Sequence, residues 1–189
     1  MKNILFIILA FIILSASSFS EKKSYKMDDL DNAFGVKLSN ISGYGVYYTR
    51  KINDDFKVQL MGMIFYYQSV KTGEDYKNFN YDIGLELQRN IYQDHNSRFY
   101  ILAGAYYYYD DDHTINSLFD EDIFKNSYNV GVGITYEYFW NRILFSFDAG
   151  YKFFEDRISV RKLKPTVENY PELNRVTKLG GGIGIGFMF

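Results

Sequence analysis

The sequence predicts an all-β fold, an eight-stranded antiparallel up-and-down β-barrel that crosses a membrane and follows a cleaved signal peptide. Two observations carry this prediction. Segments of alternating apolar and polar residues follow one another along the chain, and clusters of Asn, Asp, Gly and Ser separate them. Aromatic residues make up 20% of the 189 residues, with 19 Tyr and 17 Phe, which exceeds what a core of this size can use but is typical of the aromatic girdles of a membrane barrel.

The N-terminal end is interpreted as a secretory signal peptide. Lys2 precedes an apolar run from Ile4 to Leu14, and small residues follow this run. The run is too short to cross a bilayer, which needs about 20 residues, but it has the length of a signal-peptide core. An uncleaved anchoring helix is the alternative. We expect cleavage after Ser18 or Ser20, and we divide the chain into a signal peptide (1–20), a polar periplasmic lead (21–32) and the barrel (33–189).

Eight segments are predicted as strands: 34–38, 44–51, 56–69, 78–91, 98–109, 128–138, 142–154 and 178–189. The first two are expected to form a hairpin across a turn that contains Ser and Gly. The turn at 52–55 leads to the third segment, in which Phe56, Val58 and Leu60 share one face. The barrel therefore begins with a meander of consecutive strands.

The fourth segment has the clearest alternation. Its odd positions are apolar and its even positions are polar or Gly, as in Ile83, Leu85 and Leu87 against Glu86 and Gln88. Alternation alone does not say which face is inside. No helical segment is predicted that could cover the apolar face, so this face must meet either a second sheet or lipid. Lipid outside and a polar lumen inside is the arrangement of a membrane barrel.

The next three segments repeat the pattern. Four consecutive tyrosines, Tyr106 to Tyr109, place aromatic rings on both faces near the end of the fifth segment and suit a girdle at a membrane interface. The sixth and seventh segments alternate in the same way, with Val132 and Phe147 on the outward face against Gly133 and Ser146 on the inward face. Each of these strands is therefore expected to face lipid on one side and the lumen on the other.

The last segment, 178–189, ends on an aromatic residue. Ile183, Ile185, Phe187 and Phe189 share one face, and glycines occupy most of the other. This pattern resembles the C-terminal signal strand of bacterial outer-membrane barrels, which implies that the barrel assembly machinery reads these four residues. The glycines do not form a Gly-x-Gly-x-x-Gly motif before a helix, so they are not expected to hold a phosphate. On the inward face they leave room for larger side chains from other strands.

Strand parity places charged side chains of both signs inside the barrel: Lys37, Lys51, Lys57, Asp82, Glu86, Glu137, Asp148, Lys152 and Lys178. Lys57, Asp82, Glu86, Glu137, Asp148 and Lys152 are the predicted lumen charges. Eight strands enclose a space that side chains can fill, and opposite charges in a poorly hydrated space are expected to pair. With the inward Met61, Met63, Phe65 and Tyr67, these side chains are predicted to close the lumen.

The connections are predicted to alternate in length. The ranges 52–55, 92–97 and 140–141 are short, whereas 70–77, 110–127 and 155–177 are longer. In outer-membrane barrels the short turns face the periplasm and the longer loops face the exterior, so both termini are expected in the periplasm.

The mature chain resembles the OmpX and OmpA-transmembrane-domain type of small outer-membrane barrel. This resemblance implies an integral protein of the bacterial outer membrane. The chain departs from the OmpA pattern because no peptidoglycan-binding domain follows the barrel, so no cell-wall tether is implied.

Two sets of outer residues could carry chemistry. His113 follows three aspartates, and Ser117 lies four residues on. Small barrels similar to PagP and PagL use Ser, His and an acidic residue for lipid A chemistry, but the His-x-Ser-Asn pattern of the PagL-like deacylases is absent. His95 is read as a turn residue. The acidic residues Asp110, Asp111, Asp112, Asp120, Glu121 and Asp122 could bind divalent cations that bridge surface lipopolysaccharide. They lack EF-hand spacing, however, and a solvated loop is favoured, so no metal or cofactor is predicted.

The sequence favours a non-catalytic outer-membrane protein that displays surface loops and acts in surface interaction or envelope integrity. A small porin-like pore is the main alternative, and a lipid A-modifying barrel enzyme is a weaker one. The basic residues Arg157, Arg161, Lys162 and Lys164 could contact lipid phosphates or an acidic ligand. Expected partners are outer-membrane lipid, lipopolysaccharide, the barrel assembly machinery and an unidentified surface ligand. A formal net charge of -2 without a basic stripe argues against nucleic acid, and a monomer is expected.

Overall fold

A computed structural model describes residues 30–116, 120–164 and 168–189 of the chain. The predicted signal peptide and nearly all of the periplasmic lead lie outside these residues. The described chain consists of eight strands: β1 (Asn32–Ser39), β2 (Gly43–Lys51), β3 (Phe56–Lys71), β4 (Glu74–Gln93), β5 (Ser97–Asn116), β6 (Asp120–Trp140), β7 (Ile143–Lys164) and β8 (Glu168–Met188).

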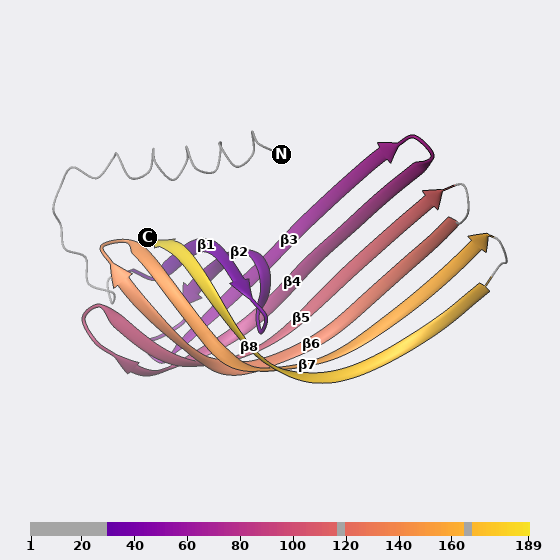
Figure 1. Ribbon diagram of the computed structural model, residues 1–189. Helices are drawn as coiled ribbons and strands as arrows, with labels where there is room; N and C mark the ends of the chain where they lie inside the picture. The colour runs from indigo at the N-terminus through magenta and orange to yellow at the C-terminus, as the bar shows by residue number, and fades with distance from the viewer. Residues whose placement is uncertain (1–29, 117–119, 165–167) are drawn as a thin grey trace.

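The strands form a closed barrel in sequence order (Figure 1). Each strand pairs antiparallel with the next, and β1 pairs antiparallel with β8 to close the ring. The closing seam runs from Ala33 opposite Met188 to Ser39 opposite Gly182. The predicted fold class, eight antiparallel strands in an up-and-down barrel, is confirmed.

All eight strands are longer than the sequence predicted, and β4 to β8 exceed the prediction most. The ranges 70–77, 110–127 and 155–177, predicted as long loops, belong almost entirely to β3 through β8. The prediction was wrong because these ranges are polar, and polar clusters were taken as loop signals. In a single sheet with water on both sides, polar side chains instead pair across strands. Lys77 lies opposite His113, which lies opposite Asp122, and the Tyr76 hydroxyl donates to Asp112 at 2.7 Å.

The barrel is closed at one end only. β2 pairs with β3 no further than Val46 opposite Gly62, and β1 pairs with β8 no further than Ser39 opposite Gly182. Beyond these points β3 to β8 continue together as one curved sheet, which extends to the upper right in Figure 1. We call this region the protruding sheet; its two outer edges are Met63–Lys71 of β3 and residues 168–180 of β8.

Apolar side chains cover the outside of the closed part. Val46, Leu60, Ile83, Leu85, Leu87, Ile101, Val130, Ile134, Phe147, Ile183 and Ile185 are each exposed on this surface. The opposite face of the same strands buries polar residues such as Glu86, Gln88 and Thr135. An apolar outer face and a polar inner face define a transmembrane barrel surrounded by lipid. None of the described residues forms a helix of the length and apolarity that a membrane span requires.

An aromatic band borders this apolar surface on its outer side. Its members, Phe79, Tyr81, Tyr107, Tyr109 and Tyr128, contact one another; Tyr81 stacks on Tyr109 with ring centroids 5.3 Å apart, and Tyr107 lies 5.2 Å from Tyr128. Only alternate members of the tyrosine run take part, because Tyr106 turns into the lumen and is buried. The band marks one interface of the membrane.

The two ends of the barrel do not differ in loop length as predicted. The connections 72–73, 117–119 and 165–167 at the protruding end are as short as 52–55, 94–96 and 141–142 at the other end. Loop length therefore does not distinguish the two ends. The protruding sheet distinguishes them, because outer-membrane barrels extend further on the exterior side than on the periplasmic side. We therefore expect the protruding sheet outside the cell and both ends of the barrel on the periplasmic side, and we name the two ends outer and periplasmic accordingly.

Leu85 should be sensitive to charge because it faces lipid. Leu85→Arg is expected to lower the free energy of unfolding in lipid vesicles by about 2–4 kcal/mol, the cost of an Arg near the bilayer midplane. Val70→Arg is the matched control, since Val70 lies near the tip of the protruding sheet, 72% exposed. Urea titrations followed by gel mobility would measure both variants, and equal destabilisation would contradict the assigned membrane boundary.

Candidate functional site

A buried cluster of charges lies in the outer half of the lumen. Lys37 Nζ is 3.4 Å from Asp148 Oδ2 and 3.6 Å from Glu86 Oε1, and it donates to the Ser42 hydroxyl at 3.2 Å. The side chains of Lys37, Glu86 and Asp148 are almost fully excluded from solvent. Because each charge has a partner of opposite sign, burial here does not leave an isolated ion.

The turn between β1 and β2 closes the lumen above this cluster. Ser39 Oγ accepts from the backbone N–H groups of Ile41 and Ser42, both at 3.1 Å, and donates to Asp148 at 2.7 Å. Ile41 is completely buried. A Cβ atom at Gly131 would lie 2.9 Å from the Ile41 side chain, so glycine at this position makes room for it. The turn therefore acts as a plug that hydrogen bonds hold in place.

A second charge cluster occupies the periplasmic half of the lumen. Glu137 forms a close ion pair with Arg98, and its carboxylate lies 3.9 Å from Lys57 Nζ. The Tyr100 hydroxyl also donates to Glu137, at 3.1 Å. These groups come from β3, β5 and β6, so the cluster ties together strands that are not all neighbours. Together the two clusters contain three cations and three anions.

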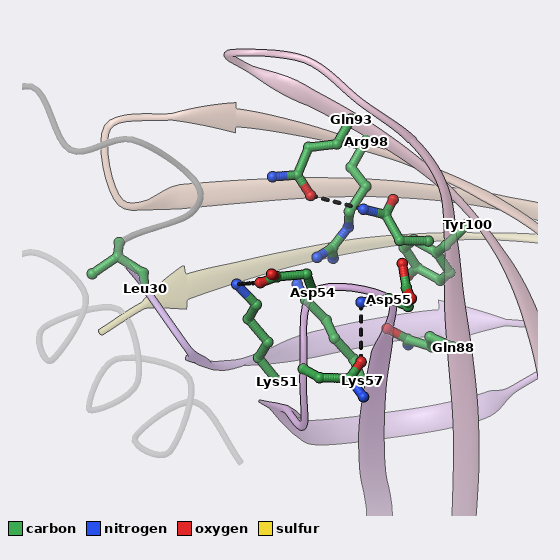
Figure 2. A pocket seen from close by; sticks show the side chains of 11 residues that line it. Leu30, Lys51, Asp54, Asp55, Lys57, Gln88, Gln93, Arg98 and Tyr100 are labelled. Carbon is green, nitrogen blue, oxygen red and sulfur yellow. Dashed lines mark hydrogen bonds and ion pairs between the residues drawn. The ribbon is translucent and has the colours of Figure 1, made fainter.

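Amide side chains extend the outer cluster through hydrogen bonds. Gln88 Nε2 lies 3.2 Å from both Glu86 and Gln59, and Thr49 donates to Gln59 at 3.2 Å. Figure 2 shows the cavity at the periplasmic mouth, which Lys57, Arg98 and Tyr100 help to line. Its volume of about 10 Å³ corresponds to a single water molecule. Side chains therefore fill the space between the two clusters and the periplasm.

The structure places the predicted lumen charges at two depths. Lys57, Glu86, Glu137 and Asp148 lie in the buried clusters just described. Asp82 and Lys152 lie at the outer mouth: Asp82 accepts from the Tyr44 N–H at 3.2 Å, and Lys152 is half-buried on β7.

Some residues predicted to fill the lumen lie outside it. Met63, Phe65 and Tyr67 are 37–42% exposed on the protruding sheet, and Lys178 is exposed on β8. These predictions were wrong because the closed part of the barrel ends nearer to the periplasmic end than strand parity can show. Met61, two residues before Met63, is still buried. Lys51 pairs with Asp54 in the periplasmic turn at 2.8 Å.

Sequence reasoning missed several residues of the closed lumen. Arg98, Tyr100 and Tyr106 share the inward parity of Gly104 on β5, and this parity was the available signal. Their spacing would have placed all three in the lumen. Ile41 had no such signal, because it lies in a turn and reaches the lumen only through the path of the backbone.

The C-terminal strand completes the ring. Ile183 and Ile185 are exposed on the outer surface, and Phe187 lies opposite Phe34 of β1 and Ile143 of β7. Phe189 exchanges backbone hydrogen bonds with Asn32, at 2.9 and 3.2 Å. The predicted assembly-signal residues therefore lie along the strand that closes the barrel.

The outer residues considered for catalysis do not form a catalytic arrangement among the described residues. His113 Nδ1 contacts Asp122 on the convex face, and Ser117 lies outside the described residues. The His95 N–H donates to Asp94 in a periplasmic turn. In the described parts of the chain, no three His, Cys, Asp or Glu side chains are grouped so as to hold a metal ion.

Several outer charges have charged or polar partners. Asn78 donates to Asp110 at 2.7 Å and to Asp112 at 2.5 Å, and the hydrogen bond from Tyr76 to Asp112 raises the pKa of Tyr76 to about 12. Of the basic residues, Arg157 and Arg175 both pair with Glu155, at 2.7 and 2.9 Å. Lys162 lies 3.8 Å from Glu121, and nothing is described of the Lys164 side chain. The protruding sheet is therefore a network of paired charges.

Known structures share this architecture. No protein-family model matches the chain, and no curated protein matches its sequence. A major outer membrane protein from Thermus thermophilus aligns with 84% of this chain and 99% of its own, with a TM-score of 0.51 and 10% identity. Ail, the attachment invasion locus protein of Yersinia pestis, aligns with 84% of this chain and 97% of its own, with a TM-score of 0.43 and 17% identity. CarO2 of Acinetobacter baumannii aligns with 85% of this chain and 99% of its own, with a TM-score of 0.40 and 10% identity.

The fold is that of small bacterial outer-membrane barrels, as the resemblance seen in the sequence implied. Barrels that face lipid with an apolar band are built for the outer membrane. The fold therefore places this chain in the bacterial outer membrane.

Arg98 should matter for stability because it neutralises a buried carboxylate. Arg98→Ala is expected to lower the free energy of unfolding by about 3 kcal/mol, since Glu137 would keep only the Tyr100 hydroxyl and the more distant cation Lys57. Arg175→Ala removes an exposed partner of Glu155 and should cost less than about 1 kcal/mol. Urea unfolding of both variants in the same detergent would test this difference, and similar losses would show that the Glu137 cluster does not stabilise the barrel.

Proposed function

We propose that this chain is a non-catalytic surface protein of the outer membrane, in which a closed barrel anchors the protruding sheet outside the cell. The filled lumen is the observation that carries this proposal. Two charge clusters, the plug turn and the buried rings of Tyr47, Tyr100 and Tyr106 occupy the space through which a solute would pass. What remains for interaction is the protruding sheet, which presents both of its faces and two strand edges.

The same proposal assigns the partners. Lipid acyl chains contact the apolar outer surface, and the headgroups of the outer leaflet, including lipopolysaccharide, contact the aromatic band. Arg157 supports this contact, because its guanidinium lies 5.5 Å from the ring of Tyr128 and is exposed above the band. The barrel is proposed to act as a monomer and to be inserted by the barrel assembly machinery.

If the lumen is closed as proposed, the barrel should not conduct ions. Protein refolded into planar bilayers should show no steady channels, because ions would have to separate Lys37 from Asp148 and Glu137 from Arg98. The double variant Lys37→Met with Asp148→Ala removes two of the three charges of the outer cluster and is the control for sensitivity, and it should raise the frequency of openings. Steady porin-like conductance of the unaltered chain would replace this proposal with the pore alternative.

Phe189 is proposed to act during insertion more than in the finished barrel. Deleting Phe189 removes two backbone hydrogen bonds to Asn32 but no buried side chain, since Phe189 is 52% exposed. The deletion should therefore lower outer-membrane levels severalfold in cells, while refolding in detergent stays nearly unchanged. Membrane fractionation and refolding yields measure the two effects. Normal outer-membrane levels of the deletion variant would contradict the proposed role of Phe189 in assembly.

A further inference from the structure

The periplasmic charge cluster of the lumen contains more positive than negative charge. Lys57 and Arg98 are its two cations, and Glu137 is its one anion. The outer cluster has the opposite excess, with one cation and two anions. No ion pair between described residues joins the two clusters, so direct contact does not neutralise either excess. Because a buried charge without a partner of opposite sign is costly, an additional anion would stabilise the periplasmic cluster.

Both cations of this cluster have donor groups that no described residue uses. The side chain of Lys57 is only 11% exposed, and its ammonium group lies 3.9 Å from the Glu137 carboxylate, beyond hydrogen-bond distance. This group has three donors, and none of them finds an acceptor among the described residues. Arg98 contacts Glu137 through Nη2, but its buried Nε also has no acceptor in the described part of the chain. Leaving buried donors of charged groups unpaired costs free energy.

The cavity at the periplasmic mouth brings these donors together beside a space for a ligand. Lys57 of β3 and Arg98 of β5 both line this cavity, as Figure 2 shows. Its volume of about 10 Å³ admits one particle of the size of a water molecule. A chloride ion is a single atom only slightly larger than water, whereas phosphate and carboxylate groups contain several heavy atoms. The size of the cavity therefore favours a monatomic anion.

The carboxylates near the mouth do not supply the missing negative charge. Asp54 pairs with Lys51 at 2.8 Å, and its side chain is 97% exposed. Asp31 and Asp55 are exposed as well, and in the described structure neither forms an ion pair with the two cations of the cluster. Water and salt screen exposed charges, so these carboxylates compensate a buried cation only weakly.

We propose that the periplasmic mouth of the barrel binds one chloride ion between the ammonium group of Lys57 and the guanidinium group of Arg98. The ion balances the excess positive charge and accepts hydrogen bonds from the donors that no described residue uses. It bridges β3 and β5, which are not neighbours in the sheet, so its binding stabilises the closed barrel. This inference goes beyond the proposed surface role and does not depend on it.

Chloride itself is the probe, with the full barrel refolded in an uncharged detergent. Sodium gluconate, whose anion is too large for the cavity, is replaced stepwise by sodium chloride at constant ionic strength. The urea midpoint of unfolding, followed by gel mobility, should rise with chloride and level off at saturation, because an ion that binds only the folded state stabilises it. A midpoint that does not change with chloride would contradict the proposal.

Two lysine variants separate this site from a general effect of salt. Lys57→Met keeps an unbranched side chain but removes the charge and the donors, so it should weaken chloride binding by at least about tenfold. Lys178→Met makes the same change at an exposed lysine of β8 and should leave the chloride dependence unchanged. The same chloride dependence in the unaltered protein and in both variants would refute the site.

Bromide can locate the ion in the unaltered protein, so this measurement does not require that a variant folds. Crystals soaked in bromide should show an anomalous scattering peak in contact with Lys57 Nζ and the Arg98 guanidinium. Density in the cavity without an anomalous signal would identify a water molecule and overturn the proposal. A barrel that binds no chloride but conducts no ions would reject this inference and leave the proposed function standing.

Discussion

The structure depends on the requirement that no backbone N–H or C=O group be left unpaired in lipid. Eight strands meet this requirement by closing on themselves, and the seam between β1 and β8 is the final step of closure. The same requirement explains where closure stops. β1 and β2 are short, and the ring opens where the strands leave the membrane, because water can then bond the free edges of β3 and β8.

Closing a ring of only eight strands brings opposite walls within reach of each other's side chains. Small residues on one wall then become necessary. Gly131 admits Ile41, and glycines at 84 and 104 admit the ring of Tyr106. Charges in this narrow space pair across strands, as Lys37 does with Glu86 and Asp148. The lumen is thus a packed core built partly from ion pairs, and its packing leaves the outer surface for lipid and the protruding sheet for interaction.

The alternation of side chains has different consequences at the two ends of the molecule. Below the aromatic band, alternation separates lipid from lumen, so one face is apolar and the other polar. Above it, both faces meet water, and the alternation gives way to paired charges such as Lys77 with Asp75, 3.4 Å apart. The β3 part of this sheet carries fewer charges and keeps exposed aromatic residues, Tyr66 and Tyr67 among them.

The sequence by itself determined the number and order of the strands and their faces within the membrane. It also determined the inward direction of Lys57, Glu86, Glu137 and Asp148. Both follow from the alternation of side chains along a strand, which is a local property and does not depend on contacts with other strands. Tertiary structure decided the rest. Which charges pair depends on the stagger between strands, and Arg98 joins Glu137 only because β5 and β6 are aligned in that register. The burial of Ile41 depends on the path of a turn. The extension of β3 to β8 beyond the membrane was read as loops, since polar residues signal a loop in an isolated segment and a solvated strand once neighbours are paired.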